Sequence, residues 1–309
     1  MLQSDSAELV GQSTTFESIK DFLSRTSKRS SPVLLLGEIG TGKELLARAI
    51  HWASNRRNHP FVVVDCSLYY ERELERELFG VVGSGARGSA RKGLLEFAVR
   101  GSCYLSNVEE LSPSIQERLY NYLETGYLQR IGSDKPVSSR VRLLFSSSKT
   151  LNGFADGGLF SRGLYEHISR EQIEIPPLRV HPEDIRPYVR SLARQFAEDS
   201  GDHANVTFSS DFWDAVETYP WPGNYDELKN EVVRLLRAGP PNITAKLLSS
   251  EISQYWIGRQ GAPEVRRVVE EIEGYIEEFK IMIRLDAEYG EILIDTDDWS
   301  GSYKSYGRV

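Results

Sequence analysis

Short apolar runs alternate with longer amphipathic stretches over residues 1–178. The apolar runs cover residues 33–36, 61–64, 103–105, 141–145 and 172–175. Each has the length of a buried strand, whereas the apolar residues of segments 44–54, 71–78 and 114–123 recur with helical spacing. Because strands that alternate with helices pair in parallel, we expect an α/β fold with helices on both faces of the sheet.

The pattern changes after the fifth apolar run, and only helical spacing continues. Pro182 is expected to begin one helix, since proline suits the first helical turn. Ser209 or Ser210 is expected to cap a second helix, and Asn224 a third. Residues 179–240 are therefore predicted to form a small helical domain.

The remaining residues, 241–309, form an acidic C-terminal segment. Residues from Gly261 onward hold 12 acidic and 6 basic side chains, whereas the whole chain has a net charge of −8. A narrow apolar stripe over residues 263–285 predicts a long helix, which could pack on the protein itself or on a partner. A brief alternation near Ile292 suggests an extra C-terminal α+β segment.

Composition excludes several classes of protein. With 40% hydrophobic and 27% charged residues the chain is typical of a soluble globular protein, and it holds no apolar run long enough for a membrane span. The first ten residues lack a secretory signal, so a cytoplasmic protein is expected. Cys66 and Cys103 are too few for a disulfide framework and are read as buried apolar residues. The acidic balance makes direct DNA binding unlikely to be this chain's task.

A glycine-rich loop carries the clearest chemistry. The sequence Gly37-Glu38-Ile39-Gly40-Thr41-Gly42-Lys43 follows one predicted strand and precedes a predicted helix. In that position the backbone N–H groups and the positive end of the helix surround an anion, and Lys43 can reach the outer phosphates of a nucleotide. The sequence therefore predicts a phosphate-binding loop.

Glu44, which follows the loop, stands where the generic motif has Ser or Thr. The sequence from Gly37 to Glu44, followed by Leu-Leu-Ala-Arg-x-Ile-His, resembles the AAA+ domain of the bacterial sigma-54-dependent transcription activators. Ordered matches continue over residues 9–237, among them Trp221-Pro222-Gly223-Asn224. The resemblance implies a P-loop AAA+ parallel sheet over residues 1–178 and a helical lid over residues 179–240.

It also implies the residues that contact ATP or ADP. These are Val10, Gly11, Gly37, Glu38, Gly40, Thr41, Gly42, Lys43, Glu44 and Leu45. Mg²⁺ is a candidate companion ion, with no ligand set assigned.

Several residues that hydrolyse ATP in this family are replaced. Ser106 and Asn107 stand where an Asp-Glu pair should hold the metal ion and polarise water, and neither carries a negative charge. Asp65 replaces the Asn that tethers the catalytic Glu. Glu109 or Glu110 could supply a displaced carboxylate.

The other positions implied by the resemblance show the same trend. The two arginine fingers fall on Ser161 and His167, with Arg162 displaced by one place. The lid arginine near the terminal phosphate falls on Asp226, which would repel phosphate. Ser148 replaces a polar Asn at the end of the fourth strand.

The partner-binding elements of the family are altered as well. The loop that inserts into the sigma factor is shorter here and has no aromatic residue, over residues 83–90. A helix-turn-helix is not visible after residue 263. A protein partner is expected but not identified, and self-association or a mixed AAA+ ring are both open.

Three hypotheses follow. The first is a pseudo-ATPase that binds ATP or ADP through Lys43 and acts as a regulator or scaffold in transcription regulation. The second is an active ATPase that uses Glu109 or Glu110, with Arg162 as a displaced finger. The third is an interaction module that binds no nucleotide.

Overall fold

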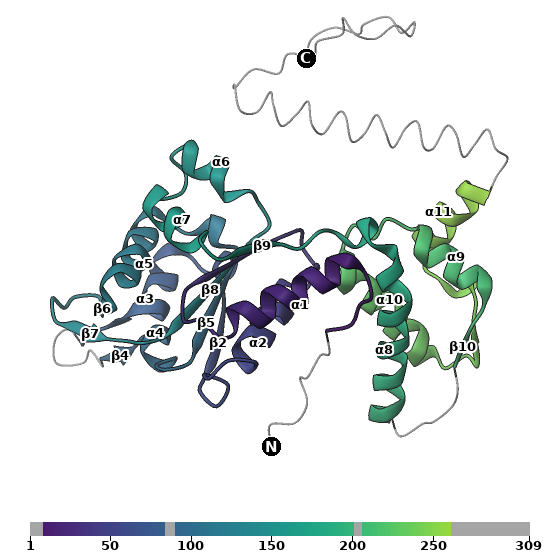
Figure 1. The fold of residues 1–309 in the computed structure, drawn as a ribbon, viewed down its shortest axis with the longest axis horizontal. Coiled ribbons are helices and arrows are strands. Elements are labelled where there is room, and N and C mark those ends of the chain that lie inside the picture. The colour runs from purple at the N-terminus through teal and green to yellow at the C-terminus, as the bar shows by residue number, and fades with distance from the viewer. Residues whose placement is uncertain (1–8, 84–89, 201–205, 261–309) are drawn as a thin grey trace, which may run out of the picture. The chain divides into compact units, whose positions relative to one another are not determined.

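The computed structural model describes residues 9–83, 90–200 and 206–260 (Figure 1). The chain divides into two compact units, with Leu248 ending the first and Ser249 beginning the second. The first unit contains the sheet and the lid, while the described part of the second holds helix α11 (Ser250–Gln260), which the sequence analysis did not anticipate. The long helix expected over residues 263–285 and the tail after it lie outside the described residues.

The first unit is built on a five-stranded sheet, and all five predicted strands are present. The strands are β1 (Val33–Leu36), β2 (Phe61–Asp65), β5 (Ser102–Ser106), β8 (Arg142–Ser147) and β9 (Gln172–Glu174). Their order is β2-β5-β8-β1-β9, and every neighbouring pair is parallel. The α/β fold is thus confirmed. The carboxyl ends of all five strands meet at one edge of the sheet.

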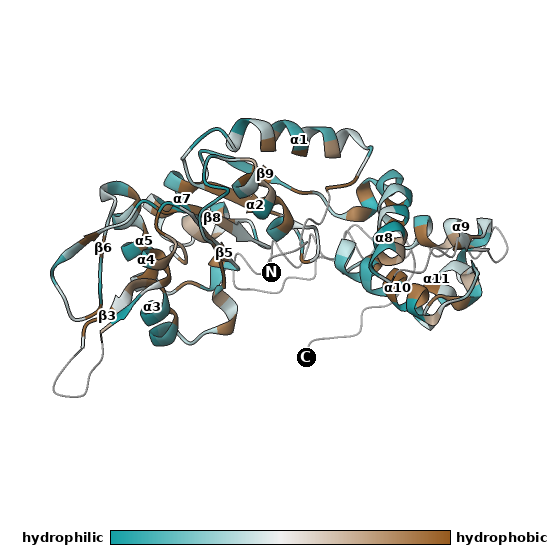
Figure 2. Ribbon diagram, turned by 90° about the horizontal axis from the view of Figure 1, so that it is seen from below, coloured by the Kyte–Doolittle hydropathy of each residue, from teal (hydrophilic) through white to brown (hydrophobic). Residues whose placement is uncertain are grey.

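Helices cover both faces of the sheet. Those on the first face are α1 (Thr14–Thr26) and α2 (Lys43–Trp52), and those on the second include α3 (Glu71–Phe79), α4 (Leu94–Phe97), α5 (Pro113–Thr125) and α7 (Arg162–Ile168) (Figure 1). A short helix α6 (Leu151–Asp156) follows β8. Hydrophobic residues gather along the strands and on the helix faces that cover them (Figure 2).

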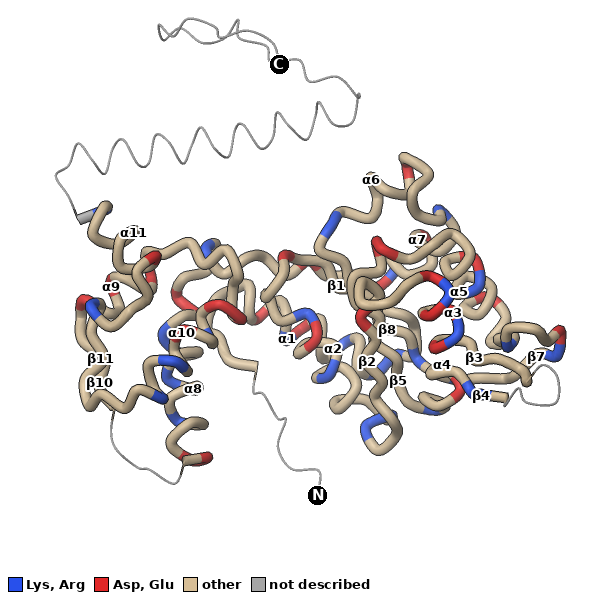
Figure 3. Tube along the Cα trace, turned by 180° about the vertical axis from the view of Figure 1, so that it is seen from behind, with Lys and Arg blue, Asp and Glu red and all other residues tan. Residues whose placement is uncertain are grey.

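The alternation of side chains along each strand produces two apolar cores. On β1, Val33 and Leu35 belong to the core beneath α1 and α2, whereas Leu34 belongs to the core on the opposite face. Because a strand buried on both faces needs apolar residues at every position, the sheet reads in the sequence as continuous apolar runs. The positions of charged residues along the chain fall mainly on the helices and loops (Figure 3).

Helix α1 was not predicted, and it ties the N-terminal segment to the start of the lid. Its N-cap residue Ser13 donates its hydroxyl to Asp184 Oδ2 at 2.6 Å. Asp184 Oδ1 also accepts the backbone N–H of Gln12 at 2.6 Å and that of Ser13 at 2.8 Å. Asp184 is only 1% exposed, so its charge is balanced within this network rather than by water.

The lid opens with a 3₁₀ turn (Pro182–Asp184) and continues in α8 (Ile185–Ser200), α9 (Ser210–Thr218) and α10 (Asn224–Ala238). Ser209 is the N-cap residue of α9, as one of the two predicted choices. The expectation of helices alone was wrong, because strands β10 (Thr207–Phe208) and β11 (Asn242–Ile243) form a short parallel pair. Two-residue strands have no periodicity that a sequence could reveal.

Two short antiparallel pairs extend from the sheet domain and were also missed. Strands β3 (Gly80–Val81) and β4 (Arg91–Lys92) form the first, and β6 (Tyr127–Gln129) and β7 (Pro136–Ser138) form the second. The first pair flanks the segment that replaces the family's sigma-factor loop. Among the described residues, every helix is too short or too polar to pass through a lipid bilayer.

Replacement of Leu34 by Ala is expected to lower the free energy of unfolding by about 2 to 5 kcal/mol, since the side chain is fully buried on β1, which has a neighbouring strand on each side. The matched control is Leu68→Ala, whose side chain is 77% exposed and which should change stability by less than about 0.5 kcal/mol. Urea unfolding followed by tryptophan fluorescence measures both. Equal losses in the two variants would contradict this description of the core.

Candidate functional site

The glycine-rich loop connects the end of β1 to the start of α2. Gly37, Gly40 and Gly42 have φ values of +147°, +78° and +90°, a region that favours glycine. Gly42 is the N-cap of α2, and no side chain caps the first turn of that helix. The N–H groups of this turn and the positive helix end are therefore free to bind an anion.

Lys43 lies inside the loop. Its Nζ donates hydrogen bonds of 2.6 Å to the carbonyl oxygens of both Gly37 and Glu38. Burial lowers the pKa of Lys43, and the carboxylates of Glu109, Asp226 and Glu38 act in the opposite direction. The ammonium group is thus held at the loop by two neutral carbonyls, which a phosphate oxygen could replace.

The first turn of α10 is docked directly on this loop. The backbone N–H of Tyr225 donates to the carbonyl of Gly40 at 3.0 Å, and the carbonyl of Gly223 packs against Gly40 so closely that a Cβ there would approach it to 2.1 Å. Gly40 is therefore required by contact as well as by its φ value. The lid and the loop share a backbone interface with no room for a side chain.

Asn224 completes this interface, and its predicted role as a helix cap was wrong. The N-cap of α10 is Gly223, and Asn224 has a φ of +52°. Its side-chain oxygen accepts the N–H of Leu178 at 2.8 Å, while its Nδ2 donates to the carbonyl of Ile39 at 2.9 Å and to Glu38 Oε2 at 3.3 Å. The side chain of Asn224 therefore bonds to residues far away in the sequence instead of capping the first turn of α10.

Glu38 also forms a two-point ion pair with Arg179, in the segment that leads into the lid. Arg179 donates to its two carboxylate oxygens at 2.7 and 2.8 Å. Both side chains are about 40% exposed, at 39% and 43%, so the pair orients the loop more than it stabilises the fold.

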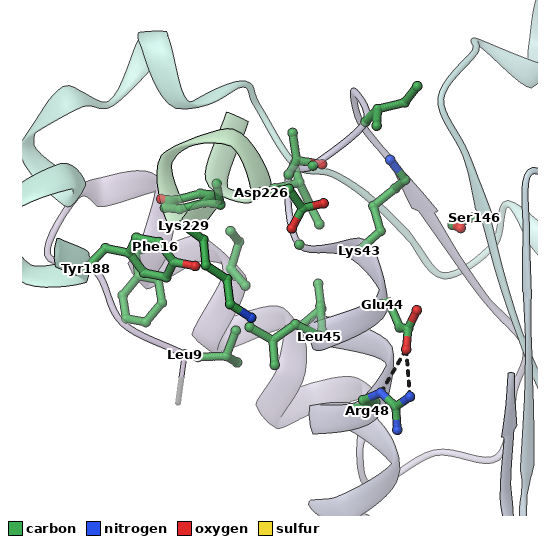
Figure 4. Close-up of a pocket in the computed structure, with 18 of the residues that line it drawn as sticks. Leu9, Phe16, Lys43, Glu44, Leu45, Arg48, Ser146, Tyr188, Asp226 and Lys229 are labelled. Atoms are coloured by element: carbon green, nitrogen blue, oxygen red, sulfur yellow. Dashed lines mark hydrogen bonds and ion pairs between the residues drawn. The ribbon is translucent and has the colours of Figure 1, made fainter. Parts of the chain in front are cut away.

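A cavity of about 630 Å³ lies beneath the docked lid (Figure 4). Its volume falls within the usual range of about 300 to 1,000 Å³ for a small-molecule site. The predicted residues that line it are Val10, Gly40, Thr41, Gly42, Lys43, Glu44 and Leu45. Of the other predicted residues, Gly11 packs on the ring of Phe16, and Gly37 and Glu38, at the start of the loop, accept hydrogen bonds from Lys43 without lining the cavity. All ten residues keep their role in nucleotide contact as a prediction.

Glu44 lines the cavity, but its carboxylate is paired with Arg48. Its Oε1 accepts hydrogen bonds from Arg48 at 2.7 and 2.9 Å, one helical turn further along α2. The pair neutralises two charges at the cavity wall (Figure 4).

Sequence reasoning missed several residues that line the cavity. They are Thr15, Phe16 and Ile19 of α1, Ile175, His181, Tyr188 of α8 and Lys229 of α10. These residues come from segments far apart in the chain, so no local motif gathers them. Of these residues, only Lys229 could have been predicted from the sequence. It follows the predicted lid position, Asp226, by about one helical turn, so the two residues share a helix face.

Leu9, Phe16 and Tyr188 lie at one end of this cavity and Lys43 of the loop lies at the other (Figure 4). Tyr188 and Tyr225 meet edge to face, with ring centroids 4.9 Å apart. Such an arrangement suits a ligand with a flat ring at one end and an anionic group at the other.

Ser106 and Asn107 lie at the carboxyl end of β5, at the cavity edge. Asn107 Nδ2 donates to Asp65 Oδ1 at 2.8 Å, across the β2–β5 pair. Burial opposes ionisation of Asp65, but hydrogen bonds from Ser67 and Asn107 outweigh it and lower the pKa of the carboxyl. Relative to the pattern that the resemblance implies, the amide and the carboxylate lie on exchanged strands.

The two candidate displaced acids lie in different surroundings. Glu109 Oε1 accepts both the N–H and the hydroxyl of Ser148, at 3.1 and 2.9 Å, whereas its Oε2 is buried and has no hydrogen-bond partner in the described part of the chain. Glu110 pairs with Lys149 at 3.3 Å on the surface. Of these two acids, Glu109 is the one whose negative charge acts on Lys43, and it raises the pKa of that lysine.

Ser161 and His167, the positions that the resemblance assigns to the arginine fingers, contact other residues of the same chain. Ser161 caps α7 by accepting the N–H of Leu164 at 3.3 Å, and His167 lies 3.0 Å from Glu124. Arg162, the displaced candidate, pairs with Asp156 and Glu166 on the surface. Within the described residues, no cluster of three or more His, Cys, Asp or Glu side chains could hold a metal ion.

A parallel sheet with a glycine-rich loop after β1, and a helical lid docked on that loop, defines a P-loop protein of the AAA+ class. The chain belongs to the sigma-54 interaction domain family, whose model matches residues 9–174, and an AAA+ ATPase lid domain model matches residues 179–258. The resemblance inferred from the sequence is thereby confirmed.

Curated relatives are bacterial transcription regulators. The hydrogenase transcriptional regulatory protein HoxA of Cupriavidus necator is 34% identical over 76% of this chain and 49% of its own length. The nitric oxide reductase transcription regulator NorR1 of the same species is 38% identical over 74% of this chain and 45% of its own. The Nif-specific regulatory protein of Azotobacter vinelandii is 36% identical over 72% and 42%. The chain spans about half the length of these relatives or somewhat less.

Solved structures of NtrX from Brucella abortus share the fold. The complex with ADP has a TM-score of 0.73 and 31% identity, over 80% of this chain and 56% of that one. The complex with ATP has a TM-score of 0.74 and 32% identity, over 80% and 55%. Nucleotide-bound relatives therefore exist with this architecture.

Replacement of Asn224 by Gly should release the lid from the loop, because Gly tolerates the positive φ and removes only the side-chain hydrogen bonds. Hydrogen exchange of the Tyr225 amide is expected to become about tenfold faster, as for the loss of a hydrogen bond worth about 1.4 kcal/mol. The control is Asn230→Gly, an exposed position on the same helix. Equal protection of this amide in all three proteins would show that Asn224 does not hold the lid.

Proposed function

We propose that this chain binds ATP or ADP in the cavity beneath the lid and hydrolyses ATP poorly or not at all. One observation carries the proposal. The phosphate loop and its docked lid are intact, whereas the strand end beside them presents Ser106 and Asn107 in place of two acids. Nucleotide-bound structures of NtrX support the binding half of the proposal.

In this proposal the loop and Lys43 hold the phosphates. The N–H groups of the first turn of α2 donate to phosphate oxygens, and Lys43 exchanges its two carbonyl partners for them. The adenine lies at the apolar end, against Leu9, Val10 and Tyr188. These groups bind and orient the nucleotide.

Ser106 and Asn107 do not provide the carboxylates that ATP hydrolysis needs. Neither the hydroxyl of Ser106 nor the amide of Asn107 can hold a divalent cation by charge or accept a proton from water. Asp65 carries a charge nearby, but it is engaged by Ser67 and Asn107. Mg²⁺, if it accompanies the nucleotide, would be held chiefly by phosphate oxygens and water, which this ion tolerates well.

The cellular role that fits these features is regulation rather than turnover. We propose a cytoplasmic regulator or scaffold that uses nucleotide to set the lid, acting on a protein partner within transcription regulation, as a self-associated assembly or inside a mixed AAA+ ring. Membership of the sigma-54 interaction domain family supports the transcriptional setting.

A second candidate is an active ATPase that depends on Glu109. The observation in its favour is the buried Oε2 of Glu109, which has no hydrogen-bond partner and whose carboxylate influences Lys43. Against it, the other oxygen is fixed by Ser148, and Glu109 does not line the cavity.

Calorimetry with ADP, with and without Mg²⁺, tests the binding half. Lys43→Ala is expected to weaken ADP binding by about ten- to a hundredfold, since it removes a charge-assisted contact to phosphate. The control Lys135→Ala alters an exposed lysine outside the cavity and should bind like the native chain. A folded native chain that gives no heat with nucleotide would instead support an interaction module that binds none.

Restoration of the acids tests the hydrolytic half. The triple variant Ser106→Asp, Asn107→Glu and Asp65→Asn returns the family's charges and its tether. Phosphate release is expected to rise at least about a hundredfold over the native chain, the lower range for a well-placed general base. Addition of Lys43→Ala should abolish the gain. Native turnover equal to that of the triple variant, and lost in Glu109→Gln, would favour the second candidate.

A further inference from the structure

Two charged residues of α10 line the nucleotide cavity from the lid side. Asp226 and Lys229 are three residues apart, so they share one face of the helix. Both point into the cavity in Figure 4, Asp226 beside the loop and Lys229 toward Leu45. The lid therefore contributes one negative and one positive charge to the same site.

The docking of α10 fixes the place of Asp226. Since Tyr225 bonds to Gly40 through its backbone, the next residue begins directly over the loop. A Cβ on Gly40 would lie 3.4 Å from the Cβ of Asp226. The carboxylate of Asp226 is near enough to Lys43 to act on its ammonium group, as is that of Glu109.

In the proposed binding mode, the carboxylate of Asp226 lies where a third phosphate would extend. When Lys43 and the loop hold the β-phosphate of a diphosphate, a triphosphate places further negative charge beyond it, toward Asp226. Glu38, another acid at the loop, is already balanced by Arg179. The added phosphate therefore meets a like charge that is not offset by a neighbouring arginine.

Lys229 places a positive charge in the cavity, in contrast to Asp226. Among the described residues it makes no hydrogen bond or ion pair, and its side chain reaches into the part of the cavity between the loop and the apolar end. In the proposed binding mode, the inner phosphates, which diphosphates and triphosphates share, would fall in that part. Lys229 should thus attract both nucleotides to a similar degree.

We propose that the site selects nucleoside diphosphates over triphosphates, with Asp226 opposing the terminal phosphate and Lys229 holding the inner ones. The inference rests on the proposed nucleotide binding and adds its specificity. A protein with this preference remains loaded with diphosphate unless triphosphate is in large excess, so it would respond to the ratio of the two nucleotides.

Calorimetric titration of the full chain with ADP and with ATP, each in EDTA and in Mg²⁺, tests the preference. The native chain is expected to bind ADP about five- to tenfold more tightly than ATP, as for one like-charge contact near a surface. Asp226→Asn keeps the shape of the side chain and should bring the ratio close to one by improving ATP binding. The control Asp214→Asn, an exposed acid on α9 outside the cavity, should keep the native ratio.

Lys229→Met tests the second half, and it should weaken ADP and ATP binding by the same factor, about fivefold. ATP bound as tightly as ADP by the native chain, or a ratio that Asp226→Asn leaves unchanged, would overturn the inference while nucleotide binding stands. Tighter ATP binding in Mg²⁺ would do the same, since it would mean that the acids hold a metal ion. No heat with either nucleotide would reject the proposed function itself.

Discussion

Asn224 joins the lid to the phosphate loop through both ends of its side-chain amide. Its oxygen accepts from Leu178 and its nitrogen donates to Ile39 and Glu38, while the neighbouring Tyr225 bonds to Gly40. Asn224 is fully buried, so these hydrogen bonds cannot be exchanged for water without cost. Together with the close approach of Gly223 to Gly40, these contacts place the first turn of α10 over the loop and bring Asp226 and Lys229 to the cavity.

The chemistry beside the loop shows how binding and hydrolysis are encoded by different residues. In the proposed function the loop and lid hold an anion through backbone groups and Lys43, and this does not require acids at the strand ends. At those ends Asp65 and Asn107 form a hydrogen bond across β2 and β5. Relative to the pattern that the resemblance implies, the amide and the carboxylate are exchanged, and the carboxylate is engaged by this hydrogen bond and by Ser67.

The sequence predicted the sheet and the loop because both are local signals. Continuous apolar runs mark strands buried on both faces, and the glycines of the loop mark positive φ values. The wrong assignment of Asn224 as a cap had a physical reason, because its partners lie 46 and 186 residues away. Phe16, Tyr188 and Lys229 were missed as cavity residues, since only the packing of three helices brings them together.

The central claim, that an intact nucleotide site is separated from hydrolysis, is tested most directly by ³¹P NMR of ATP and Mg²⁺ with an equal amount of the native chain. The account predicts that the phosphate resonances shift on binding and that the γ-phosphate signal persists over hours. Conversion of the bound signals to those of ADP and free phosphate within minutes would contradict it.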